Sequence, residues 1–133
     1  MEKRIKIFIC LLIITLTLTA CNSKYQYYYR DNYYHGVIII NNSSHEIKTV
    51  TIHKPAGVES TGMNADNSTI KNGEDIFFYM DEAKNCTFSI TVTDNNSNEF
   101  TSQGFTRNFS YDVVYYIYVN DSINGEVIFS DKK

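Results

Sequence analysis

Residues 86–93 read CTFSITVT, and this stretch decides the fold class. Apolar residues stand at positions 86, 88, 90 and 92, and Thr or Ser stands at each position between them. Such alternation with period two is typical of a β-strand that packs one face on a core and exposes the other. The sequence therefore predicts a half-buried antiparallel strand at its centre.

Further apolar or alternating runs lie on both sides of this strand. They predict strands at residues 37–40, 47–53, 76–80, 99–103, 113–119 and 126–130, with 113–119 as a central strand because both of its sides are apolar or aromatic. Polar clusters at 41–44, 71–74 and 94–98 and the Asn124-Gly125 pair are turn signals.

Two segments differ from this pattern. Residues 54–69 contain Pro55 and two glycines among small polar residues, so a long loop is expected there, and residues 80–85 could form a helical turn. About seven short strands without a convincing helix predict an all-β fold, a small antiparallel β-sandwich that is Ig-like or similar. A small closed barrel is the alternative.

The first 20 residues have the composition of an export signal. Three basic residues at positions 3, 4 and 6 precede an apolar run that ends at Ala20. At 1.5 Å per residue, the 16 residues from Ile5 to Ala20 would span about 24 Å as a helix, less than a hydrocarbon core of about 30 Å. The length suits a cleaved signal peptide.

The run ends in Leu18-Thr19-Ala20-Cys21, which resembles the lipobox of bacterial lipoproteins. The resemblance implies cleavage before Cys21 and attachment of a diacylglycerol to its sulfur. Several acyl chains on Cys21 would anchor the mature protein stably in a membrane. We therefore expect a signal peptide at 1–20, a lipidated Cys and Tyr-rich tether at 21–35, a β-sandwich domain at 36–133, and a location in the bacterial cell envelope.

The tether is unusually aromatic, with six tyrosines between residues 25 and 34. Three interpretations stay open for it: an extra edge strand packed on the domain, a linker lying at the lipid headgroups, or a ligand surface.

Charge and composition exclude several classes of protein. The chain has 133 residues, of which 43% are hydrophobic and 14% aromatic, so it is neither a disordered tail nor a polytopic membrane protein. Removal of residues 1–20 leaves nine basic and fourteen acidic residues, a net charge of −5. Such an acidic domain is a poor partner for nucleic acid or anionic lipid.

No catalytic, cofactor or metal site is predicted. Cys86 is the one cysteine left after processing and lipidation, so no internal disulfide can form, and it is expected to be a small buried apolar residue. His35, His45 and His53 are too scattered for a zinc site and are expected to be exposed. Residues 94–99 imitate the start of a calcium loop but lack its glycine and its final glutamate, so a polar hairpin turn is expected.

The mature part also resembles small bacterial envelope β-sandwich domains of unknown function. The shared pattern spans about 60 residues, carried by Asn41-Asn42-Ser43, the strand from Ile47 to Ile52, Asn64, Asn72-Gly73-Glu74, and the stretch from Cys86 to Asp94. This resemblance implies the fold and no activity.

One candidate binding surface follows from the strand at 113–119. If Val113, Tyr115, Ile117 and Val119 face the core, then Val114, Tyr116 and Tyr118 form an aromatic stripe on the other side. Such stripes bind glycans or partner proteins, unless the N-terminal tyrosines or the other sheet cover them.

We therefore expect a lipid-anchored, non-catalytic binding or interaction module for a protein or polysaccharide partner. A structural or assembly subunit of an envelope complex is the alternative, and a small hydrolase or an inhibitor is the third class.

Overall fold

The computed structural model describes residues 35–131 of the chain. The predicted signal peptide, Cys21 and the tether as far as residue 34 lie outside the described residues. Residues 35–131 form nine strands and one short 3-10 turn. In chain order these are β1 (Gly36–Asn42), β2 (Ile47–His53), η1 (Pro55–Gly57), β3 (Glu59–Gly62), β4 (Asp75–Tyr79), β5 (Ala83–Asp94), β6 (Glu99–Thr101), β7 (Phe105–Phe109), β8 (Val114–Asp121) and β9 (Val127–Ser130).

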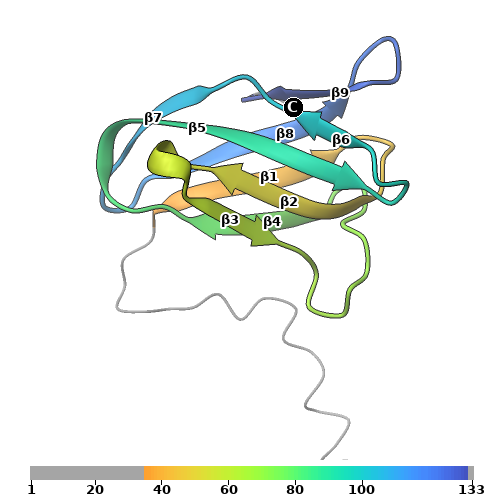
Figure 1. Ribbon diagram of the computed structural model, residues 1–133, viewed down its shortest axis with the longest axis horizontal. Coiled ribbons are helices and arrows are strands. Elements are labelled where there is room, and N and C mark those ends of the chain that lie inside the picture. Colours follow the sequence, from red (N-terminus) through yellow and green to blue (C-terminus); the bar gives the residue numbers. More distant parts are fainter. Residues whose placement is uncertain (1–34, 132–133) are drawn as a thin grey trace, which may run out of the picture. The chain divides into compact units, whose positions relative to one another are not determined.

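The strands form two sheets that pack face to face (Figure 1). The first sheet has the order β4-β1-β8-β9, and the second has the order β3-β2-β5-β6 with β7 also paired to β5. The all-β sandwich predicted from the sequence is therefore confirmed. Within the described part, no helix is both long and apolar enough to span a membrane.

The longest strand, β5, organises the second sheet. One of its edges pairs with β2, and its other edge pairs first with β7 and then with β6. Ser102 connects these two short strands: its amide donates to the carbonyl of Ile90 at 2.8 Å, and its hydroxyl accepts from the amide of Ile90 at 2.9 Å. The ladder of β5 is thus continued by a side chain where β6 ends.

The core lies between the sheets and takes alternate residues from each strand. From β5, Phe88, Ile90 and Val92 are at most 1% exposed, as the alternation at 86–93 predicts. From β8, Ile117 and Val119 are equally buried. Gly62 of β3 shows how close the layers are, because a β-carbon there would clash with Ile76 Cδ1 on β4.

One pairing differs from the antiparallel arrangement expected throughout. Strands β1 and β8 run parallel, with Gly36 beside Val114 and Asn42 beside Asn120. Both strands are interior to their sheet, as expected for 113–119, and both carry apolar residues on their two sides. Strands of this composition are typical of parallel pairing in buried positions.

The structure corrects three local predictions. Residues 54–69 are not one long loop, because they contain η1 and the edge strand β3. Strand β7 was not predicted, since its centre, Thr106-Arg107-Asn108, is polar. Residues 80–85 form no helical turn, and β5 begins within them at Ala83.

Candidate functional site

The outer side of the first sheet carries a row of apolar and aromatic side chains. Register partners on neighbouring strands point to the same side of a sheet. Ile38 lies between Phe77 on β4 and Tyr116 on β8, and the next row of the same side joins Ile40 to Tyr118. We call this surface the aromatic face; it comprises Ile38, Ile40, Phe77, Tyr79, Val114, Tyr116, Tyr118 and Ile128.

The sequence predicted part of this surface. Ile117 and Val119 are in the core, so Val114, Tyr116 and Tyr118 point outward as expected. Tyr116 is 51% exposed, whereas Tyr118 and Val114 are half-buried. Tyr115 points inward, where its ring meets Phe109 edge-on at 5.4 Å.

The remaining members of the aromatic face come from other strands. Tyr79 on β4 is 55% exposed and Ile128 on β9 is 47% exposed. Ile38 is only 8% exposed although it does not belong to the core cluster, which indicates that its neighbours on the outer side surround it. The apolar run at 37–40 indicates such an arrangement, because a strand with apolar residues on both sides needs apolar neighbours on its outer side as well as in the core.

The aromatic face ends in a row of polar side chains. Asn42 donates from Nδ2 to Oδ1 of Asn120 at 2.7 Å, and Asn120 donates from Nδ2 to the hydroxyl of Ser130 at 2.9 Å. Each of these side chains comes from a different strand, namely β1, β8 and β9. The hydrogen bonds hold the amides in place at the border of the aromatic surface.

A charged group enters the aromatic face at one position. Asp75 lies beside Ile40 in the register of β4 and β1, and it is partly buried. Burial raises the pKa of the Asp75 carboxyl above its ordinary value. The residues that make up the aromatic face carry no charged side chain.

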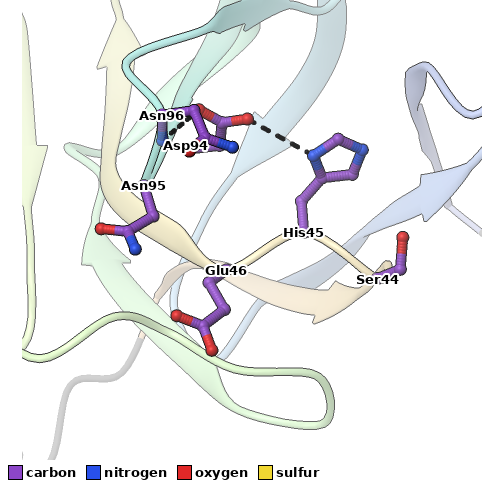
Figure 2. A pocket seen from close by; sticks show the side chains of 6 residues that line it. All are labelled: Ser44, His45, Glu46, Asp94, Asn95 and Asn96. Carbon is purple, nitrogen blue, oxygen red and sulfur yellow. Dashed lines mark hydrogen bonds and ion pairs between the residues drawn. The ribbon is translucent and has the colours of Figure 1, made fainter.

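A second candidate lies between the connection from β1 to β2 and the turn of the β5–β6 hairpin. An open depression of about 340 Å³ is lined by Ser44, His45, Glu46, Asp94, Asn95 and Asn96. Figure 2 shows the His45 ring pointing toward Asp94, with 3.5 Å between Nδ1 and the carboxylate Oδ2. The other ring nitrogen lies 3.2 Å from the carbonyl oxygen of Gly125. His45 therefore connects the loops after β1, β5 and β8.

Asp94 closes the loop between β5 and β6. Its Oδ1 accepts from the backbone amides of Asn96 and Asn98, each at 2.8 Å, and its Oδ2 accepts from the side-chain amide of Asn98 at 2.9 Å. The side-chain bond from Asn98 lowers the pKa of Asp94 most, and the backbone amides and His45 lower it further against the opposing effect of burial. The polar hairpin turn expected at 94–98 is thus confirmed.

The contacts of Asp94 and His45 are those of a structural support. Both carboxylate oxygens already accept hydrogen bonds from the protein. Within residues 35–131, no group of three or more His, Cys, Asp or Glu side chains is arranged to hold a metal ion. We therefore infer that Asp94 and His45 stabilise the loops at this end of the molecule.

The lowered pKa of Asp94 predicts that its contribution to stability is lost in acid. A carboxyl group with a folded pKa below the unfolded value, about 3.9, stabilises the fold when ionised and loses this effect as the pH falls. Asp94→Asn should lower the free energy of unfolding by about 1 to 3 kcal/mol at neutral pH. The difference from wild type should shrink between about pH 4 and pH 2, as measured by denaturant unfolding.

Asp75 supplies the matched control for this experiment. Because its pKa is raised, its ionised form disfavours the folded state, and this penalty disappears as the pH falls. Asp75→Asn should therefore show the opposite pH dependence. A difference between wild type and Asp94→Asn that is constant from pH 7 to pH 2 would contradict the role of the charge.

The other histidines and Cys86 take up individual structural positions. His53 hydrogen-bonds Glu59 and Thr91, each at 2.8 Å, on the outer side of the second sheet. His35 is 3% exposed, not exposed as expected, and its ring packs on Tyr79 with 4.8 Å between ring centroids. Cys86 is half-buried rather than fully buried, and it packs against the core cluster.

Comparisons with known proteins bear on the fold. No family model and no curated protein matches the sequence. A solved structure does resemble it. That structure is described as the NMR structure of a protein from Eubacterium rectale; it has a TM-score of 0.53 and 17% sequence identity, and the match covers 76% of this chain and 91% of that one. At this identity the similarity supports the shared fold alone.

Proposed function

We propose that this chain is a lipid-anchored envelope protein whose β-sandwich is a non-catalytic binding module. The observation that carries the proposal is the exposure of Tyr116, at 51%, beside Ile38 in the aromatic face. Contiguous apolar surfaces on small domains mark sites of interaction. Tyrosine suits such sites because it provides a large contact area at a low cost in side-chain entropy.

The environment of the titratable side chains supports the non-catalytic part of the proposal. General acid–base and nucleophilic catalysis require a base positioned beside a reactive group in a site that a substrate can enter. His45 contacts a loop carboxylate and a backbone carbonyl, and His53 contacts a glutamate and a threonine on an open sheet surface. These contacts explain the positions of both histidine side chains as structural, with no need for a substrate.

The lipid anchor is tested by labelling cells with a clickable palmitate analogue. The wild-type protein should take up the label and fractionate with membranes, whereas Cys21→Ser should do neither, because the acyl chains on Cys21 provide the membrane affinity. Cys86→Ser serves as the matched control and should behave as the wild type does. Label that persists in Cys21→Ser, or that disappears in Cys86→Ser, would contradict the assignment of Cys21.

The binding role is tested by cross-linking intact cells that express the tagged full-length protein. A partner captured by the wild type should be lost in Tyr116→Ala and in Tyr118→Ala, while both variants keep the circular dichroism spectrum and unfolding midpoint of the wild type. Capture of the same partner by all three proteins would exclude the aromatic face. A stoichiometric protein partner with no dependence on these tyrosines would instead favour a structural subunit of an envelope complex.

A further inference from the structure

We propose that the ligand of the aromatic face is a neutral polysaccharide chain that lies across β4, β1, β8 and β9. This inference rests on the proposed binding function and names the class of ligand. Three properties of the face carry it: its charge, its size, and the polar groups at its border.

The charge of the first sheet argues against a polyanionic ligand. Residues 36–44, 72–83 and 108–131, which include all four strands, contain eight acidic residues and no Lys, Arg or His. One of these acids, Asp131, is paired with Arg107 of β7, and His35 packs on Tyr79 just before β1. Acidic groups are nevertheless in excess around this sheet. A nucleic acid, an anionic polymer or an anionic lipid surface requires the opposite charge. Apart from Asp75, the residues of the aromatic face are uncharged, so a neutral ligand suits it best.

The size of the face argues against a second copy of this chain. Strands β4, β1, β8 and β9 have five, seven, eight and four residues. At about 3.3 Å per residue and about 4.8 Å between strands, they give roughly 380 Å² of surface. A stable protein interface needs about 800 Å² from each partner. A dimer would therefore have to extend beyond the four strands, onto connections that carry Asp81, Glu82 and Asp112.

The arrangement of apolar and polar groups fits a sugar polymer. The C–H face of a sugar ring packs on an aromatic side chain, and its hydroxyls exchange hydrogen bonds with amides. Here the rings of Tyr79, Tyr116 and Tyr118 are spread over two strands, and the amides of Asn42 and Asn120 are held beside them. An extended chain can cover several rings at once without burying a large area.

Affinity electrophoresis of the full-length protein, purified in detergent, tests this proposal. Native gels would contain galactomannan, xyloglucan, mixed-linkage β-glucan, dextran or soluble starch, with polygalacturonate as the anionic control. The wild type should be retarded by at least one neutral polymer and not by polygalacturonate, and added salt should leave the retardation unchanged. Tyr116→Ala should weaken the affinity about fivefold or more.

Tyr111→Ala is the matched control, because Tyr111 is 48% exposed and lies in the turn before β8, outside the aromatic face. It should bind as the wild type does. The proposal is overturned if no neutral polymer retards the wild type, if polygalacturonate retards it equally, or if Tyr116→Ala retains full affinity.

A photo-crosslinker placed at position 116 in cells separates this proposal from the proposed function. A single defined protein captured at position 116, without retardation in any gel, would overturn the polysaccharide proposal and leave the binding function standing. Neither capture nor retardation would overturn both.

Discussion

Phe88→Ala is expected to lower the free energy of unfolding by about 3 to 5 kcal/mol. Phe88 is 1% exposed and packs between Phe105 and Phe109, with ring centroids 5.7 and 5.8 Å away. Its removal leaves a cavity where the long strand β5 meets β7. A domain of this size has a total stability of about 5 to 15 kcal/mol, so the loss is a large part of the whole. Urea unfolding measures it as a lower midpoint at an unchanged slope.

Two further variants keep this prediction testable. Thr87→Ala changes the exposed neighbour of Phe88 and should cost less than about 1 kcal/mol, because surface substitutions usually do. If Phe88→Ala does not fold, Phe88→Leu should fold with a smaller loss, about 1 to 2 kcal/mol. Equal effects of Phe88→Leu and Thr87→Ala would contradict a core centred on Phe88.

Asn41→Ala is expected to cost about 3 kcal/mol, an unusually large effect for a polar residue near the end of a strand. Asn41 is 2% exposed, and its side chain is fully used. Its Nδ2 donates to the carbonyls of His45 and Ile70 at 2.7 and 2.8 Å, and its Oδ1 accepts from the amide and the hydroxyl of Ser43. The variant would leave buried backbone groups without partners, which is the costly part of losing a hydrogen bond.

Asn42→Ala provides the comparison for Asn41→Ala. Asn42 is the next residue, half-buried on the other side of β1, and the structure gives its side chain a hydrogen bond to Asn120. Its loss should cost about 1 kcal/mol. Thermal or urea unfolding of the two variants should therefore differ by about 2 kcal/mol, and similar values for both would contradict the role assigned to Asn41.

Local patterns in the sequence predicted the strands whose sides differ in polarity. The alternation at 86–93 gave both the position and the buried side of β5, and Asn124-Gly125 gave the last turn, where Gly125 has a φ of 78°. The sequence does not predict β3, because its residues, Glu-Ser-Thr-Gly, include no large apolar side chain that would indicate a buried side. β3 is formed because its backbone pairs with β2, and pairing leaves no periodic signal in a polar edge strand.

Local sequence patterns do not predict contacts between residues that are far apart in the chain. The parallel pairing of β1 with β8 joins residues that are nearly 80 positions apart. The stripe at Tyr116 was predicted from one strand, but its extension to Tyr79 and Ile128 depends on which strands lie beside β8 and β1. Similarly, Asn41 was recognised as a turn residue, whereas its bond to the carbonyl of Ile70 requires the folded chain.

Chemical nitration of the full-length protein tests the central claim, that the aromatic face is open to a ligand. After brief treatment with tetranitromethane, the modified tyrosines are identified by fragment mass spectrometry. Tyr116 and Tyr79 should react as fast as Tyr111 and several-fold faster than the inward-facing Tyr115, whose hydroxyl donates to the carbonyl of Asn108. Protection of Tyr116 to the level of Tyr115 in the native protein, lost on unfolding, would contradict the account.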